Sequence, residues 1–271
     1  MNSCSVVDLG RIAWTEAFTL QQRVVAARKA GTVPDTLLFC EHPNTITLGR
    51  NARLQHLLAS ESLLRQKRVE LHHTNRGGDI TYHGPGQLVG YPILHLAAIR
   101  RDIGWYMRML EEAMIRASAE FGVTAVREAG KTGVWVAKGG AAPEKLAALG
   151  VHLSRWVTSH GFAYNVSTDL RYFGLIVPCG IAGSGATSLE KLLGGASVAI
   201  AEVAERVAKH LGAMLNLEMR PVPRVQFMRE LERAELSAQL GAPAEEILPA
   251  AAKVSGTTIP GAGMEAVRSD A

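Results

Sequence analysis

Residues 76–92 read Arg76-Gly-Gly-Asp-Ile-Thr-Tyr-His-Gly-Pro-Gly-Gln-Leu-Val-Gly-Tyr-Pro92, with five glycines and two prolines among polar residues. Glycine lets the main chain approach a ligand closely and adopt positive φ, while Arg76, Tyr82 and His83 supply hydrogen-bond donors and rings. The segment matches neither a G-x-x-x-x-G-K-[ST] phosphate loop nor a G-x-G-x-x-G turn. The hypothesis is therefore that this segment forms a pocket for a ligand that is not a nucleotide. The alternative is that it is a plain hairpin loop.

Hydrophobic periodicity on both sides of this segment predicts an α/β (α+β) fold, with a mixed sheet and flanking helices. The expected helices are 13–30, ended by Gly31, then 102–121, with Asp102 as N-cap, 198–215 and 224–240. The expected strands are 36–40, 44–48, 133–136 and 151–157. The last ~30 residues are rich in Ala, Pro, Gly and Ser, and burial of their few large apolar groups is not expected to offset the entropy of ordering them.

The bulk composition is that of an ordinary globular protein, since 47% of the 271 residues are hydrophobic and 20% are charged. The longest apolar stretches are too short or too rich in glycine to span a bilayer, and the first residues lack the pattern of a secretory signal. We therefore expect a cytoplasmic protein without a membrane segment. The net charge of +4 is spread along the chain, which disfavours nucleic acid as a partner and would attract acidic proteins.

The three cysteines, Cys4, Cys40 and Cys179, are far apart and form no C-x-x-C pair, so neither a disulfide framework nor a zinc site is expected. Cys4 and Cys40 fit the role of small buried apolar residues. Cys179 differs because it lies between a proline and a glycine, directly after an apolar run, where a nucleophile can be exposed on a loop.

A cysteine attacks as its thiolate, which a nearby cation stabilises. The candidates upstream of Cys179 are Lys131, Lys138 and Lys145, and sequence spacing does not choose among them. His160 is a rival, because histidine is the usual base beside a catalytic cysteine. These residues favour a cysteine enzyme and leave its base open.

Four motifs, at residues 76–87, 145–151, 158–165 and 178–181, together resemble those of the lipoyl(octanoyl) transferase family. The runs Glu41-His-Pro43, Thr47-Leu-Gly-Arg50 and Asp169-Leu-Arg-Tyr-Phe173 resemble the same family, and the resemblance covers roughly residues 6–220. It implies a biotin/lipoate protein ligase-like catalytic domain at 1–220, followed by a C-terminal helix and tail at 221–271. The chain departs from the family pattern at Trp14, where tyrosine is usual, and in a Gly-Gly-Ala-Ala-Pro insertion after Lys138.

The resemblance also implies a catalytic pair. Cys179 would carry the acyl group as a thioester, and Lys145 would lower the pKa of that thiol and act as general acid and base. Lys145 is chosen by its motif and by its family-like separation from Cys179. The implied acyl pocket is lined by Arg76, Gly77, Gly78, Asp79, Ile80, Thr81, Tyr82, His83, Ala148, Leu149, Gly150, Gly161, Phe162 and Ala163. Core packing is the alternative for Ala148, Leu149 and Phe162, and a structural role is the alternative for His83 and His160.

The implied reaction moves an octanoyl group from octanoyl-acyl carrier protein to a lysine of lipoyl domains. The acceptors would be the E2 subunits of 2-oxoacid dehydrogenases and the glycine cleavage H protein, in the first step of endogenous lipoate synthesis. No ATP, metal or other cofactor is expected. An ATP-dependent lipoate or biotin ligase of the same fold and a non-catalytic binding module are the alternatives.

Overall fold

The computed structural model of the chain describes residues 2–139, 141–177 and 185–240. Within these residues, an eight-stranded sheet has the order β11-β1-β2-β6-β10-β9-β8-β7, and a three-stranded sheet has the order β4-β3-β5. The strands are β1 (Asn2–Arg11), β2 (Asp35–Glu41), β3 (Thr45–Leu48), β4 (Glu70–His73), β5 (Ile80–His83), β6 (Gln87–Ile93), β7 (Val126–Glu128), β8 (Lys131–Lys138), β9 (Ala141–Ser154), β10 (Val157–Asn165) and β11 (Leu217–Pro221). The helices are α1 (Trp14–Ala30), α2 (Glu61–Gln66), α3 (Ile103–Ala119), α4 (Leu189–Leu192), α5 (Ile200–Leu215) and α6 (Arg224–Leu240).

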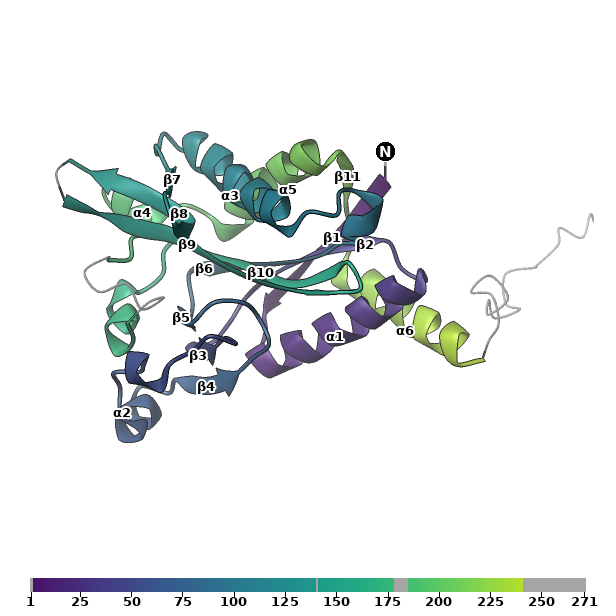
Figure 1. Cartoon of the computed structure of the whole chain (residues 1–271), viewed down its shortest axis with the longest axis horizontal. Helices are drawn as coiled ribbons and strands as arrows, with labels where there is room; N and C mark the ends of the chain where they lie inside the picture. The colour runs from purple at the N-terminus through teal and green to yellow at the C-terminus, as the bar shows by residue number, and fades with distance from the viewer. Residues whose placement is uncertain (1, 140, 178–184, 241–271) are drawn as a thin grey trace, which may run out of the picture.

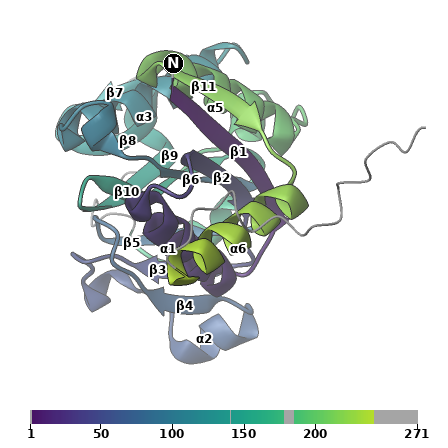
Figure 2. The ribbon, with the colours of Figure 1, turned by 90° about the vertical axis from the view of Figure 1, so that its right-hand side faces the viewer.

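The large sheet is mixed, as predicted. Strand β1 pairs in parallel with β11 and β2, and the pairs from β2 across to β7 are antiparallel. Helices α3 and α5 cover one face of this sheet, while α1 and α6 lie against the other (Figure 1). Figure 2 shows the same layers from the side, with the small sheet and α2 below β10. The predicted α/β architecture with flanking helices is confirmed.

Local signals located the helices well. The carboxylate of Asp102 accepts a hydrogen bond from the backbone N–H of Trp105 at 2.8 Å, as an N-cap should. Gly31 ends α1 with φ of 77°, a left-handed conformation that glycine adopts without strain. In the residues that the structure describes, every helix is too short or too polar to cross a bilayer.

Two expectations about strands are wrong. The predicted strand at 151–157 is interrupted by the turn of the β9–β10 hairpin, where Arg155 and Trp156 have φ of 51° and 63°. Turns with positive φ usually contain glycine or asparagine, so arginine and tryptophan gave no turn signal. Part of the stretch expected as an insertion loop after Lys138 is also strand, because Lys138 ends β8 and pairs with Ala141, which begins β9.

The C-terminal helix α6 packs on the body of the protein. Phe227 and Leu231 are buried in the same core cluster as residues of α1 and β2. Arg23 on α1 donates two hydrogen bonds to the carboxylate of Glu235, at 2.8 and 2.7 Å. The domain boundary at residue 220 stays a prediction, and the tail at 241–271 lies outside the described residues.

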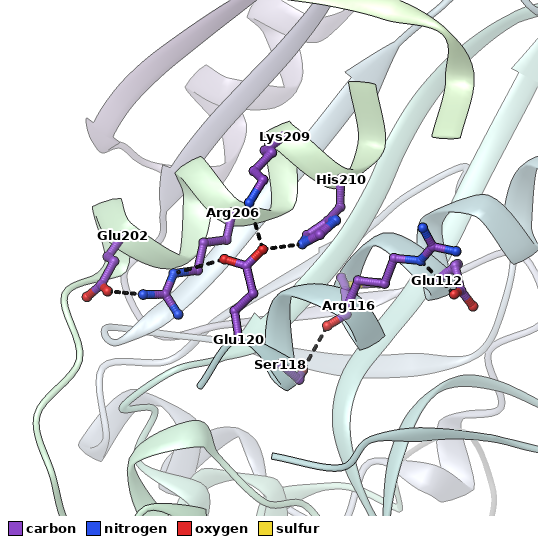
Figure 3. Close-up of polar contacts among 9 residues, drawn as sticks. Glu112, Arg116, Ser118, Glu120, Glu202, Arg206, Lys209 and His210 are labelled. Carbon is purple, nitrogen blue, oxygen red and sulfur yellow. Dashed lines mark hydrogen bonds and ion pairs between the residues drawn. The ribbon is translucent and has the colours of Figure 1, made fainter. Parts of the chain in front are cut away.

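A group of charged residues joins α3 to α5 on the surface (Figure 3). The carboxylate of Glu120, just past the end of α3, accepts hydrogen bonds from Lys209 at 2.9 Å and from His210 at 2.6 Å. Arg206 lies 3.6 Å from the other carboxylate oxygen. Exposed pairs of this kind contribute about 0–1 kcal/mol each, so the buried contacts between α3 and α5 supply most of the stability there.

Candidate active site

A cavity lies where β9 and β10 meet the small sheet, and most of the predicted pocket residues line it. This first cavity is bounded by Arg76, Gly78, Asp79, Ile80, Thr81, His83, Ala148, Leu149, Gly150, Gly161, Phe162 and Ala163, all of which sequence motifs indicated. Residues that the sequence did not single out for this cavity also line it, namely Trp14, Thr47, Thr74, Val89 and Tyr91, together with His160. Gly77 and Tyr82 do not.

The floor of the first cavity is made of small residues that face each other across β9 and β10. Ala163 pairs with Ala148, and Gly161 pairs with Gly150. A Cβ atom on Gly150 would lie 2.7 Å from the carbonyl oxygen of Gly77, so only glycine lets the 76–78 segment pack directly on β9. The N–H of Gly77 donates to the carbonyl of Val151 at 2.8 Å. Gly77 therefore holds the wall of the cavity in place without lining it.

Arg76 ties this wall to β3. Its guanidinium donates to the carbonyl of Thr47 at 2.7 Å and to the hydroxyl of the same residue at 3.0 Å, and the side chain is buried. Both of these hydrogen bonds come from Nη2, and Nε lies 3.3 Å from the same hydroxyl, so the three contacts together fix the orientation of the planar guanidinium. Arg76 thus positions the loop as well as lining the cavity.

Tyr82 points away from the cavity into the core of the small sheet. Its hydroxyl donates to Asn44 Oδ1 at 2.8 Å, and its ring stacks on Tyr172 with centroids 5.1 Å apart. Burial raises the pKa of Tyr82 above its usual range. The side chain alternates with those of Thr81 and His83 along β5, which explains why neighbours in one motif have different surroundings.

Both histidines in the cavity are buried and held by amide side chains. His83 Nδ1 lies 2.8 Å from Gln87 Oε1, and His160 Nε2 lies 2.7 Å from Asn75 Oδ1. Burial lowers the pKa of each to about 3, so both are neutral near pH 7. A general base works best when its pKa is near the working pH, which argues against His160 as the base.

Lys145 lines a second, smaller cavity that continues the first. The two cavities share Thr81, Ala148 and Ala163, and their volumes are about 50 and 20 Å³. The Lys145 side chain is buried, and its Nζ lies 4.5 Å from the centroid of the Trp135 ring. The second cavity is completed by Gln87, Trp135, Asn165, Phe173, Gly185 and Ala186.

The other lysine candidates differ from Lys145. Lys131 Nζ lies 3.9 Å from a carboxylate oxygen of Glu128 and lines neither cavity. Lys138 is the last residue of β8, seven positions along the hairpin from Lys145. Of Lys131 and Lys145, Lys145 is the one that lines a cavity.

The backbone of Lys145 is paired with the segment that follows Cys179. Its N–H donates to the carbonyl of Gly185 at 2.8 Å, and its carbonyl accepts from the N–H of Thr187 at 3.0 Å. On the other side of the cysteine, the N–H of Val177 donates to the carbonyl of His56 at 2.8 Å. Cys179 itself lies outside the described residues.

Two buried amides support this pairing. Asn165 Nδ2 donates to the carbonyl of Thr187 at 3.0 Å, and Gln87 Nε2 donates to Asn165 Oδ1 at 2.9 Å. Both residues lie within the motifs quoted above, so position in a motif was an available signal that sequence reasoning did not use. Phe173 likewise ends the quoted run 169–173, whereas Trp135 lies outside every quoted motif. Among the described residues, no three His, Cys, Asp or Glu side chains are placed to bind one metal ion.

Comparison with known proteins agrees with this architecture. The family model of the lipoyl protein ligase A/B catalytic domain matches residues 14–212. The octanoyltransferase of Solibacter usitatus is 50% identical over 221 residues, covering 82% of this chain and 97% of that protein. The octanoyltransferase of Chloroflexus aurantiacus is 49% identical over 229 residues, covering 84% and 99%.

Solved structures show the same fold at low sequence identity. A bi-partite lipoate protein ligase from Thermoplasma acidophilum superposes with a TM-score of 0.67 at 16% identity, covering 88% of this chain and 93% of that one. A lipoate-protein ligase A bound with ATP gives 0.66 at 16% identity, covering 88% and 95%. The expected ligase-like fold is confirmed, and at this identity the likeness extends to the fold alone.

Proposed function

Because the chain belongs to the lipoyl protein ligase A/B catalytic-domain family, among its octanoyltransferases, we propose that Cys179 carries the octanoyl group as a thioester. The enzyme is an acyltransferase. In this proposal the octanoyl group comes from octanoyl-acyl carrier protein and goes to a lysine of a lipoyl domain, in E2 subunits or the glycine cleavage H protein.

The observation that carries the proposal is the pairing of Lys145 with residues 185–187, which begin six positions after Cys179. Lys145 thus lies beside one end of the segment that contains the cysteine, and it is buried in a cavity continuous with the first one. A buried lysine next to a thiol stabilises the thiolate. The arrangement therefore supports Lys145 as the partner of Cys179.

The reaction has two half-reactions. In the first, the Cys179 thiolate attacks the carbonyl carbon of the donor thioester, a new C–S bond forms, the bond from that carbon to the carrier sulfur breaks, and protonated Lys145 gives its proton to the leaving carrier thiol. In the second, the lysine amine of the acceptor attacks the acyl-enzyme, the C–S bond to Cys179 breaks, and Lys145 accepts the proton that the amine loses. The donor is already a thioester and the product is an amide, so the transfer requires no ATP.

The first cavity suits the acyl chain, because small residues form its floor and it shares Thr81, Ala148 and Ala163 with the cavity that Lys145 lines. Each buried methylene contributes roughly 0.8 kcal/mol, so an octanoyl tail gains about 6 kcal/mol at most. That is enough to hold the donor while the thioester lies at the second cavity.

Intact-mass measurement after mixing the protein with octanoyl-acyl carrier protein, without ATP, tests the proposal. We expect one added octanoyl group, located on Cys179 by peptide mapping and removed when a lipoyl domain is added. A Cys179→Ala variant is the control and should stay unacylated. Modification only when free octanoate and ATP are supplied would identify an ATP-dependent ligase instead.

A further inference from the structure

We propose that Trp14 closes the end of the first cavity farthest from Lys145 and thereby limits the acyl chain to about eight carbons. This inference deepens the proposed function and rests on it for the direction in which the acyl chain lies. It assigns a specificity role to a residue at the start of α1, outside the four motifs that define the site.

The register of β9 and β10 sets the direction of the cavity. Ala148 pairs with Ala163 where the two cavities join, and the ladder then continues through Gly150 and Gly161 to the pair of Val151 with His160. At the Ala148–Ala163 end of this run, the first cavity meets the second cavity, which Lys145 lines. His160 lies at the opposite end of this run, Thr74 lies within 3.4 Å of its imidazole, and Phe18 stacks on both His160 and Trp14, which places Trp14 at that end.

The length of this path matches the proposed substrate. Three residue steps separate the Ala148–Ala163 pair from the Val151–His160 pair, which is about 10 Å at roughly 3.3 Å per residue. An extended chain advances roughly 1.2 Å per bond, since three backbone bonds span about 3.6 Å. The seven carbon–carbon bonds of an octanoyl group therefore span about 8 Å by the same measure, which brings its methyl group to Trp14.

Trp14 is fixed in position by aromatic contacts on two sides. Its ring stacks on Phe18, one turn along α1, at 5.0 Å, and on His72 of β4 at 4.9 Å. Phe18 in turn stacks on His160 at 5.6 Å. Trp14 is 5% exposed. Because the ring is held from α1, β4 and β10 together, it cannot turn aside to admit a longer chain without breaking these contacts.

The chemistry of this end also singles out Trp14. Thr74 presents a hydroxyl group and His160 an imidazole there, and the two lie 3.4 Å apart. A terminal methyl group gains nothing from desolvating such groups. The indole ring is the large apolar surface available to it, so Trp14 both receives the methyl group and ends the path.

The test compares chain-length profiles of the wild type with those of Trp14→Ala and Trp14→Leu. Dissociation constants are measured for hexanoate, octanoate, decanoate and dodecanoate, and acyl-enzyme formation for the matching acyl carrier proteins. In the wild type, affinity should rise about fourfold per methylene up to eight carbons and then stop rising. In the variants the rise should continue to ten or twelve carbons, and the decanoyl-to-octanoyl rate ratio should increase at least about tenfold, in line with two further buried methylenes.

Trp14→Phe keeps an aromatic wall and should keep the octanoyl limit. Trp105→Ala is the matched control. Trp105 is on α3, its ring lies under the guanidinium of Arg100, and it lines neither cavity. Circular dichroism and thermal melting show whether the Trp14→Leu variant is folded. If it is folded and keeps the chain-length profile of the wild type, the inference is overturned. A shifted binding profile without any acyl-enzyme in the wild type supports the inference and refutes the proposed transfer, so the two failures are distinguishable.

Discussion

Lys145 and Lys131 both lie over the indole ring of Trp135, with Nζ 4.5 and 5.3 Å from its centroid. The two cations differ in burial and surroundings, because Lys145 lines the second cavity whereas Lys131 lies beside Glu128. An indole face attracts an ammonium group, and the attraction strengthens where water is excluded. The chain therefore offers a matched pair of lysines on one ring, of which Lys145 lines a cavity and Lys131 does not.

Replacing Lys145 by Met should lower acyl transfer by at least about 100-fold, the usual contribution of a general acid or base. Lys145→Arg should restore little, because a guanidinium keeps its proton. Lys131→Met is the control and should retain near-wild-type turnover, measured in single-turnover assays with a lipoyl domain. If Lys131→Met is the inactive variant, the assignment of Lys145 is wrong.

Cys179→Ser should abolish the acyl-enzyme, because a hydroxyl group does not ionise near neutral pH as a thiol does. Cys4→Ser and Cys40→Ser should stay active. Both of those thiols are buried, and burial raises their pKa well above the usual range, which makes them unreactive. Alkylation of the native protein by iodoacetamide, followed by peptide mapping, should therefore label Cys179 first. Faster labelling of Cys40 would contradict this assignment.

The first cavity could be predicted from sequence because its walls come from continuous motifs, in which glycines mark close backbone approach. Gly150 and Gly161 are examples, since each is required by the packing of a neighbouring strand or loop. The second cavity could not be predicted in the same way. Trp135 is on β8 and Asn165 on β10, which lie on either side of β9, while Phe173 comes from the short helix at 170–175 that packs on the small sheet, so the tertiary fold brings the three together.

Trp14 illustrates a different limit. The sequence marks it as a departure from the family pattern but does not indicate what it contacts. Its neighbour His72 comes from the small sheet, whose parallel pairing of β3 with β4 has no local signal. Non-local pairing of this kind is set by the whole fold, so the end of the first cavity appears only in three dimensions.

Gly133→Ala should reduce activity more than stability. Gly133 has φ of 137°, and a Cβ atom there would lie 2.9 Å from the carbonyl oxygen of Ala147 and 3.3 Å from Lys145 Cε. The strained backbone costs about 1–3 kcal/mol, and relief of the contact would move the lysine. Gly130→Ala is the control, because Gly130 also has positive φ, 73°, but has nothing within 4 Å of its would-be Cβ. If the two variants have the same kcat, the contact between the added Cβ atom at position 133 and Lys145 does not matter for catalysis.

Acid should destabilise the protein through three buried histidines. Burial lowers the pKa of His42 to about 4 and of His83 and His160 to about 3, whereas the unfolded chain titrates near 6.5. The unfolded state thus binds more protons, so the stability is full above about pH 6.5 and falls as the pH drops toward 3. At pH 5.5 each histidine accounts for a loss of at most about 1.4 kcal/mol.

Calorimetric melting between pH 7 and 5 measures this loss, with about 2–4 °C expected per kcal/mol. In the His160→Gln variant, Tm should fall less between pH 7 and pH 5, and the difference should correspond to the stability loss given above for one histidine. His73→Gln is the control, since His73 is exposed at the end of β4. A slope that is the same in both variants would mean that His160 is protonated in the folded state as readily as in the unfolded one.

Asn165→Ala should lower kcat by about tenfold or more, because it leaves the buried carbonyl of Thr187 without its amide donor and so loosens the segment paired with Lys145. A buried carbonyl left unpaired costs about 1–3 kcal/mol, and the middle of that range, about 2 kcal/mol, corresponds to roughly 30-fold. Gln87→Ala is the matched variant. It removes the contact to Asn165 Oδ1 but keeps the Asn165–Thr187 hydrogen bond, so its kcat should fall less. The KM for the lipoyl domain should stay within about twofold in both variants, since hydrogen bonds that position Lys145 act on the chemical step. A rise in that KM at unchanged kcat would instead place Asn165 in acceptor binding.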